Sequence, residues 1–223
     1  MATRGFEAKE TKRETPRCDE YRKTILRSGR GNKLTGQIGE YLVCAELGRR
    51  GLIATPFSGN VPTFDVLATD ELCRTVPIQV KASRSDNWPS DARHWMDVKL
   101  ENEIQDYSCR LTLQNPDLIY VCVAIAARSG GDRFFILTKS DLQGVCIAAY
   151  SSFMSKHQGR RPRNPYSYEN RYYISGLQGF ENNWDLISSR LKASSPDHSL
   201  TTDQSLTTEE ESVVFSDIVT RLL

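Results

Sequence analysis

The first regular pattern in the chain is a set of apolar residues at helical spacing between residues 34 and 47, which predicts a helix there. One predicted core stripe consists of Leu34, Ile38, Tyr41, Leu42 and Ala45. A second stripe, at i, i+3, i+4 and i+7, consists of Glu40, Val43, Cys44 and Leu47, and Gly39, Glu46 and Arg50 remain for solvent. A carboxylate at a buried position is unfavourable without a partner. We therefore expect Glu40 to face a structural Arg or Lys, a metal ion or a catalytic site.

Three strand-like segments follow the helix, at residues 52–57, 63–69 and 75–83, with turn residues between them. The third segment alternates most clearly: one face holds Val76, Ile78, Val80 and Ala82, and the other holds Gln79, Lys81 and Ser83. In the second segment Asp65 shares a face with Thr63 and Leu67. A polar face of this kind is usually the solvent side of an antiparallel sheet.

Beyond residue 83 the pattern predicts a loop at 84–93, a short strand at 95–100, a fully buried strand at 118–126 and its hairpin partner at 133–137. Ser140 with Gln143 has the spacing of a capping box and predicts the start of a helix. The apolar stripe of that helix is Leu142, Val145, Cys146, Ala149 and Phe153. An edge strand at 172–175 and a last helix, marked by Phe180, Trp184, Ile187 and Leu191, complete the domain.

These elements predict an α/β (α+β) fold in which helices flank one mixed central sheet. We expect a basic N-terminal arm at residues 1–33, a domain at 34–192, and a Ser/Thr-rich linker with a short terminal helix at 193–223. The net charge is only +1, yet residues 1–34 hold ten Lys or Arg against five acids. Such an arm suits nucleic acid, although a solvated terminus is the commoner explanation.

The composition narrows the class of protein. The six cysteines form no C-x-x-C pair and no His stands at ligand spacing. The first twenty residues are polar rather than a signal peptide, and the longest apolar run, 118–127, is too short to span a bilayer. No phosphate-binding loop of Walker spacing is present. We therefore expect a cytoplasmic protein with no membrane partner and no nucleotide cofactor in this chain.

The residues that carry chemistry are Glu40, Asp65 and the run Gln79-Val80-Lys81. Gln79 and Lys81 share a strand face, and Asp65 converges with them if its strand pairs with theirs. An Asp supplies hard anionic oxygen for Mg²⁺, and the Gln79 amide oxygen and the Val80 carbonyl can complete a sparse set of ligands. Lys81 can orient or deprotonate an attacking water, or neutralise charge on a phosphate.

The order of helix Glu, strand Asp and then Gln-x-Lys on the next strand resembles the PD-(D/E)XK nuclease superfamily, in a Q-x-K variant. The superfamily includes restriction endonucleases and Holliday-junction resolvases. Residues 36–40, 63–65 and 78–83 carry the resemblance. It implies a restriction-endonuclease-like fold and a nuclease, DNA preferred, that hydrolyses phosphodiester bonds with a metal-activated water.

By the same resemblance, Asp65 would be the principal ligand of Mg²⁺, for which Mn²⁺ can substitute, and Lys81 the catalytic lysine. Glu40 would bind the metal directly or through water, and Gln79 would take the place of the second acid. Two departures stand out: no proline directly precedes Asp65, and Gln79 removes one negative charge from the site. Duplex cleavage usually needs two active sites, so a homodimer is reasonable.

Three alternatives stay open. The same residues could be a solvated strand face with a Glu40–Lys81 salt bridge. The chain could also be a nuclease fold without turnover that binds nucleic acid or protein, or an unrelated α+β scaffold. A geometric criterion separates them, because an active nuclease should bring Glu40, Asp65 and Lys81 into one cavity.

Basic residues elsewhere are candidates for gripping the substrate. Arg84 and Arg93, with Trp88 and His94, follow the Lys81 strand. A second cluster mixes cations with aromatic residues, as nucleic-acid surfaces do, and comprises Arg160, Arg161, Arg163, Tyr166 and Tyr168. An ordinary basic, solvated loop is almost as good an explanation of this cluster.

Overall fold

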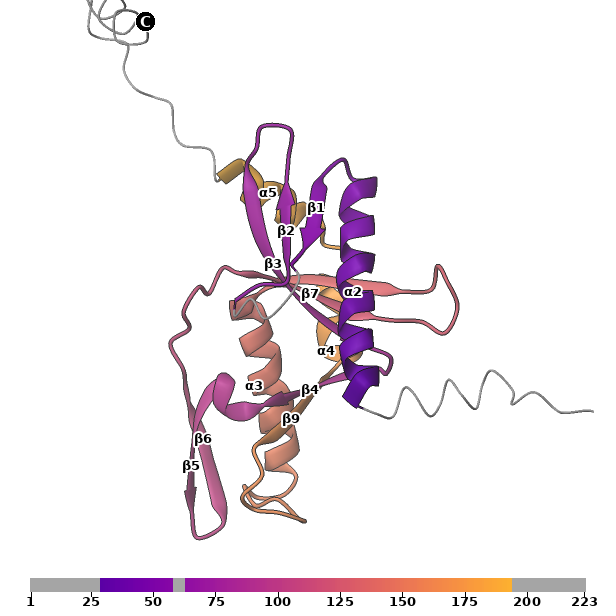
Figure 1. The fold of residues 1–223 in the computed structure, drawn as a ribbon. Helices are drawn as coiled ribbons and strands as arrows, with labels where there is room; N and C mark the ends of the chain where they lie inside the picture. Colours follow the sequence, from indigo (N-terminus) through magenta and orange to yellow (C-terminus); the bar gives the residue numbers. More distant parts are fainter. Residues whose placement is uncertain (1–28, 58–62, 194–223) are drawn as a thin grey trace, which may run out of the picture.

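The computed structural model describes residues 29–57 and 63–193. At its centre is a five-stranded sheet in the order β1-β2-β3-β7-β8 (Figure 1). The strands are β1 (Ile53–Pro56), β2 (Val66–Thr69), β3 (Thr75–Ser83), β7 (Ile119–Ala124) and β8 (Arg133–Thr138). β3 and β7 run parallel and every other neighbouring pair is antiparallel. The predicted mixed central sheet is thus confirmed, and β3 has the predicted bounds.

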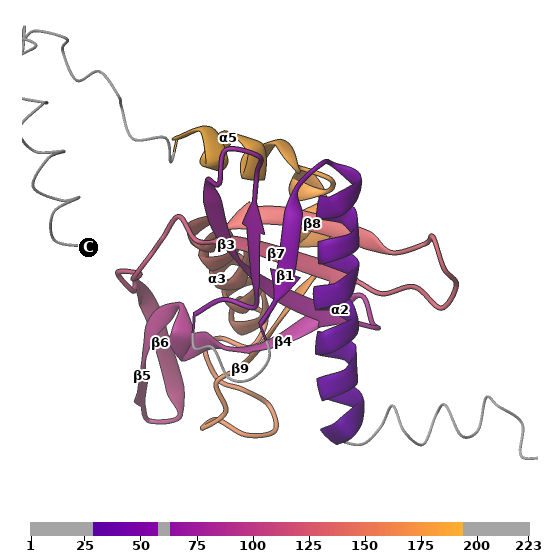
Figure 2. The same cartoon turned by 45° about the horizontal axis from the view of Figure 1, so that its top comes forward.

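Helices cover both faces of this sheet. One face packs against α2 (Gly29–Arg49) and α5 (Asp185–Ala193), whose Val43, Leu47 and Ile187 join a core of strand residues. The other face packs against α3 (Lys139–Ser155), through Leu142 and Cys146. In Figure 2, α2 lies in front of the strands and α3 behind them. The predicted flanking of the sheet by helices is therefore confirmed.

Two small two-stranded ribbons and three short helical segments lie on the side of the central sheet that α3 covers. The ribbons pair β4 (Asn87–Asp91) with β9 (Glu169–Tyr173) and β5 (Met96–Glu101) with β6 (Ile104–Arg110). The short segments are η1 (Ala92–His94), α4 (Ile174–Leu177) and η2 (Gln178–Phe180). The predicted loop at 84–93 is wrong, because β4 pairs with a strand some eighty residues later and its sequence therefore carries no local hairpin signal.

Several predicted boundaries need correction. α2 begins at Gly29 rather than at residue 34. The predicted basic arm up to residue 28, and the predicted linker and terminal helix from residue 194 to 223, lie outside the described residues. Strand β9 ends at Tyr173, whereas the edge strand was predicted at 172–175. The capping box of α3 is formed by Thr138 and Asp141 rather than by Ser140 and Gln143. Gln143 is buried instead, and its Nε2 donates to the carbonyls of Trp95 and Leu111 at 2.7 and 2.8 Å.

The buried side of α2 also differs from the first predicted stripe. Leu34 and Tyr41 are 43% and 57% exposed, and the sheet-facing line is Gly39, Val43 and Leu47. Gly39 was expected in solvent. It is buried because α2 lies so close to β3 that a Cβ on Gly39 would stand 2.4 Å from the Ala82 Cβ. In α3, similarly, Phe153 is 39% exposed while Tyr150 and Met154 take the buried positions.

This contact predicts that Gly39→Ala destabilises the fold. The added Cβ collides with a strand residue that cannot swing aside, and overpacking of this kind costs about 1–3 kcal/mol. A fall in Tm of roughly 2–4 °C per kcal/mol is expected for a domain of this size, measured by thermal unfolding.

Gly36→Ala is the matched control, since nothing lies within 4 Å of a Cβ at that position of the same helix. Alanine is the better helix former, so Gly36→Ala should leave Tm unchanged or raise it. The double variant Gly39→Ala/Ala82→Gly removes the colliding atom and should recover part of the loss. Equal Tm values for Gly39→Ala and Gly36→Ala would contradict the close contact.

Candidate active site

The pairing of β2 with β3 brings Asp65 and Gln79 together. Val66 is the partner of Ile78, so Asp65, one residue earlier, stands opposite Gln79. The Gln79 Nε2 donates to Asp65 Oδ2, and the main-chain N–H of Val80 donates to the same oxygen at 2.8 Å. The Asp65 N–H in turn donates to the Ile78 carbonyl at 2.9 Å. The carboxylate is therefore fixed by β3 at the point where β2 begins.

The main-chain groups of Val80 point to the same edge of β3 as Asp65. The N–H and C=O of one strand residue point to the same side, because paired residues exchange both bonds. The Val80 N–H points to Asp65, so its carbonyl also points to the edge of β3 beyond the last paired residue of β2. This arrangement puts the predicted metal donors Asp65, Gln79 and Val80 side by side.

Glu40 approaches this edge from α2, which packs on the sheet face opposite to that covered by α3. Because Gly39 packs tightly on Ala82, α2 lies close to the sheet at Glu40, the next residue. Burial raises the pKa of the Glu40 carboxyl, and the negative charge of Asp65 raises it further. One turn later the pKa of the Cys44 thiol is also raised, by burial and then by the charge of Glu40. The charge of Asp65 is thus the second cause, after burial, of the raised Glu40 pKa.

The alternative salt bridge between Glu40 and Lys81 is not found. Within residues 29–57 and 63–193, the ion pairs closer than 4.0 Å include neither of these two side chains. No cation is among the groups that shift the Glu40 pKa. The partner that a half-buried carboxylate needs is therefore not supplied by Lys81.

Lys81 follows Gln79 on the same face of β3 and is exposed. Its carbonyl accepts a hydrogen bond from the Trp88 indole Nε1 at 2.9 Å, and the Trp88 ring is stacked on Tyr172 with 5.6 Å between centroids. Lys81 lines a cavity of about 460 Å³ on the α3 side. Glu40 and Asp65 do not line that cavity, so the criterion that all three share one cavity is not met.

Tyr120 is a residue of this site that sequence reasoning missed. It is the register partner of Gln79 on β7 and also lines the cavity beside Lys81. Burial raises its pKa, and the charges of Cys122 and Asp65 raise it further. The continuous apolar run at 118–126 concealed it, because only the parallel pairing of β3 with β7 puts Tyr120 next to Gln79.

The two arginines after β3 have different surroundings. The Arg84 Nε donates to the Thr35 hydroxyl of α2 at 3.3 Å, which keeps its exposed guanidinium on the Glu40 side of the sheet edge. Arg93 forms an ion pair with Asp91 at 2.7 Å and lies over the Tyr168 ring at 4.5 Å. Arg84 therefore contacts α2, the helix that carries Glu40, whereas Arg93 is engaged in contacts within the fold.

The arginines of the second basic cluster do not line the cavity beside Lys81. They lie in the loop between α3 and β9, which Figures 1 and 2 show at the end of the molecule away from the β2–β3 turn. Arg160 forms an ion pair with Glu103, and Arg161 packs over Phe153 at 4.9 Å. Arg163 is exposed in the same loop. Of these three arginines, Arg161 contributes mainly to packing.

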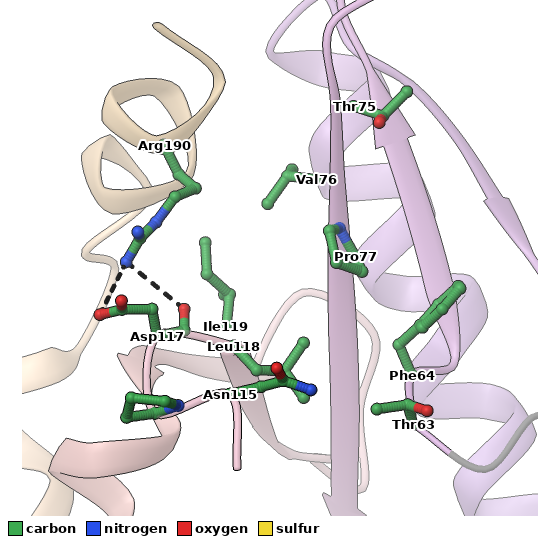
Figure 3. A pocket seen from close by; sticks show the side chains of 11 residues that line it. Thr63, Phe64, Thr75, Val76, Pro77, Asn115, Asp117, Leu118, Ile119 and Arg190 are labelled. Atoms are coloured by element: carbon green, nitrogen blue, oxygen red, sulfur yellow. Dashed lines mark hydrogen bonds and ion pairs between the residues drawn. The ribbon is translucent and has the colours of Figure 1, made fainter. Parts of the chain in front are cut away.

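A larger cavity, of about 560 Å³, lies at the other end of β3 (Figure 3). It is lined by apolar residues such as Phe64, Pro77 and Ile119, and the Arg190–Asp117 ion pair at 3.2 Å stands at its side. It contains none of the predicted site residues. The predicted site residues Gln79 and Lys81 lie toward the opposite end of β3.

The donors at the candidate site are all hard oxygens, from Glu40, Asp65, the Gln79 amide and the Val80 carbonyl, which suits Mg²⁺ or Mn²⁺. Two of these donors, Glu40 and Asp65, are carboxylates, and the charge of Asp65 contributes to the raised pKa of Glu40. Across the described ranges, no group of three or more His, Cys, Asp or Glu residues could hold a metal. The same ranges contain no helix with the length and hydropathy to cross a membrane.

No family model and no curated protein matches the chain in sequence. Among solved structures, a bacterial homing endonuclease is 15% identical over 72% of this chain and 95% of its own, with a TM-score of 0.37. The Holliday junction resolvase Hjc of Archaeoglobus fulgidus, an archaeal hyperthermophile, is 12% identical over 64% of this chain and 87% of its own, with a TM-score of 0.33. Both similar proteins are nucleases.

The raised pKa of Glu40 predicts that Glu40→Gln stabilises the fold at neutral pH. The folded state binds this proton more tightly than the unfolded chain, so the contribution of Glu40 favours folding at low pH and is lost as pH rises through the raised pKa. Removing the charge should raise Tm by roughly 1–3 °C above pH 7 and have no effect at about pH 4.

Glu46→Gln on the same helix is the control of opposite sign. Hydrogen bonds and charge from Arg50 and Arg49 lower the Glu46 pKa, so its stabilisation is present at neutral pH and lost in acid. Thermal unfolding between pH 4 and 8 should show Glu46→Gln less stable than wild type at neutral pH. A lower Tm for Glu40→Gln at pH 7 would refute the repulsion between the two carboxylates.

Proposed function

We propose that this protein is a divalent-metal-dependent nuclease of the PD-(D/E)XK kind, which hydrolyses phosphodiester bonds in nucleic acid, with DNA preferred. The observation that carries the proposal is the junction of Asp65 with Gln79 and Val80, with Lys81 next on the same strand face. Each of these residue types has a task in phosphodiester hydrolysis.

Asp65, Glu40, Gln79 and the Val80 carbonyl would hold Mg²⁺ or Mn²⁺. The bound ion supplies Lewis acidity, which polarises the phosphate and acidifies water. Asp65 is held in place by two hydrogen bonds from β3, and the one from the Val80 N–H is independent of the Gln79 side chain. Gln79 presents its amide nitrogen to Asp65, and rotation of the amide by half a turn would present Oε1 instead.

Lys81 acts on the phosphate from the α3 side. Its ammonium is exposed and makes no ion pair within the described part of the chain, so all of its charge is available to a phosphate oxygen or to an attacking water. The Trp88 hydrogen bond to the Lys81 carbonyl fixes the backbone from which this side chain extends. Arg84 would add a phosphate contact next to the same edge.

A second candidate is a nuclease fold without turnover that binds nucleic acid or a protein partner. The hydrogen bond from Gln79 to Asp65 favours it, since a neutral amide already satisfies the carboxylate that a metal would otherwise need to neutralise. The unneutralised Glu40 beside Asp65 favours catalysis, because a binding surface has no use for this repulsion. A homodimer would supply the two sites that duplex cleavage needs.

Plasmid and oligonucleotide cleavage with Mg²⁺, Mn²⁺ or EDTA tests the proposal. We expect metal-dependent cutting that falls at least about 100-fold in Asp65→Ala and in Lys81→Ala, because each change removes a group that stabilises the transition state. Lys99→Ala removes an exposed lysine of β5 and should cut like wild type. Intact substrate with every metal, combined with a gel shift, would favour the binding function.

Metal binding has its own readout in thermal unfolding. Mg²⁺ or Mn²⁺ should raise the Tm of wild type, since an ion that binds only the folded state stabilises it by about 2.7 kcal/mol at 100 times its Kd. Asp65→Ala should abolish the rise, and Gln79→Glu should increase it by restoring a negative charge. A rise of equal size in Asp65→Ala would show that the ion binds elsewhere.

A further inference from the structure

The cavity beside Lys81 is larger than the proposed catalytic set requires. Its volume of about 460 Å³ lies within the range of pockets that enclose small ligands. It forms where the α3 face of the sheet meets β4, β9, η1 and the first turn of α3. A phosphate held by Lys81 alone needs only a surface. The additional space is therefore available to another part of the substrate.

The floor of this cavity is aromatic and lies below the surface. Trp95, Tyr120 and Tyr172 line it and are only 7%, 9% and 2% exposed. The Trp95 Nε1 donates to the Ser90 hydroxyl at 2.6 Å, so its polar atom is satisfied within the cavity wall. Aromatic side chains that line a recess are suited to a nucleobase, which has two apolar faces.

Two lysines supply positive charge along the cavity. Lys81 and Lys139 line it, and its one lining acid, Asp91, forms an ion pair with Arg93 at 2.7 Å. The Lys139 Nζ donates to the Gln114 carbonyl at 2.8 Å, which uses one of its three donors and leaves two. Two lysines therefore border the same recess, one in the catalytic set and one outside it.

We propose that this cavity receives one unpaired nucleotide of the substrate, with its base over the aromatic floor and its phosphate at Lys139, beside the phosphate that Lys81 addresses. The inference rests on the proposed nuclease function and names its substrate class, which is single-stranded or branched nucleic acid. A base within a duplex cannot enter a recess of this kind, because it must first be unpaired and unstacked.

Binding measured without cleavage tests the inference. Fluorescence anisotropy in EDTA compares three labelled DNA probes of one sequence: a single strand, a perfect duplex and a duplex with a single-stranded flap. Lys139→Met keeps the length of the side chain and removes the ammonium. We expect it to weaken binding of the single strand and the flap about tenfold and to lower the single-strand salt slope by about 0.7, without weakening duplex binding.

Two variants serve as controls. Lys139→Arg keeps the charge and should restore binding, and Lys192→Met removes an exposed lysine from α5, on the other face of the sheet, and should change nothing. Thermal unfolding confirms that each variant is folded. An equal loss for single strand and duplex would reduce Lys139 to an ordinary backbone contact, and no loss would leave the cavity without a nucleotide; either result overturns the inference.

Cleavage of the same three probes in Mg²⁺ distinguishes this inference from the proposed function. If wild type cuts none of the probes but binds the flap through Lys139, the proposed nuclease function is refuted and the inferred nucleotide-binding cavity is supported. Wild type that cuts the perfect duplex as fast as the flap, with Lys139→Met unimpaired, keeps the nuclease and refutes the cavity.

Discussion

The close approach of α2 to β3 determines where the candidate site can form. Gly39 is the residue that permits it, since any Cβ there would overlap Ala82. The helix therefore lies low enough on the sheet for Glu40, the next residue, to come within the electrostatic influence of Asp65. The two carboxylates come from adjacent layers of the fold, Glu40 from α2 and Asp65 from the start of β2. They approach each other where β2 begins and β3 continues with β7 as its one neighbouring strand.

The position of Glu40 at this edge of β3 is electrostatically unfavourable in the folded protein. Glu40 is half-buried, has no ion pair among the described residues and is repelled by Asp65. A stable fold could remove this repulsion with one neutral side chain, as Gln79 already does opposite Asp65. The proposed metal site rests on this pair of carboxylates, because a bound cation would offset their repulsion.

The parts of the structure that could be predicted from sequence are those that depend on local pattern. The alternation in β3 gave its bounds and put Gln79 and Lys81 on one face, because side-chain direction in a strand follows from position alone. The buried side of α2 was half wrong, since a glycine offers no hydrophobic signal and Gly39 was judged by polarity rather than by space. β4 was missed and Tyr120 was not recognised, because both depend on partners distant in sequence.

The candidate site itself contains both kinds of residue, those that depend on neighbouring strands and those that depend on partners distant in sequence. Asp65, Gln79 and Lys81 lie on adjacent strands joined by a short turn, so their convergence needs only one correct register. The recess beside Lys81, by contrast, is assembled from β4, β7, α3 and β9, and no segment of the sequence contains enough of it to be recognised. The residues proposed to act on a phosphodiester are thus encoded locally, whereas the recess proposed to receive a nucleotide is a property of the assembled fold. Sequence reasoning can for that reason reach the reaction class before it reaches the substrate.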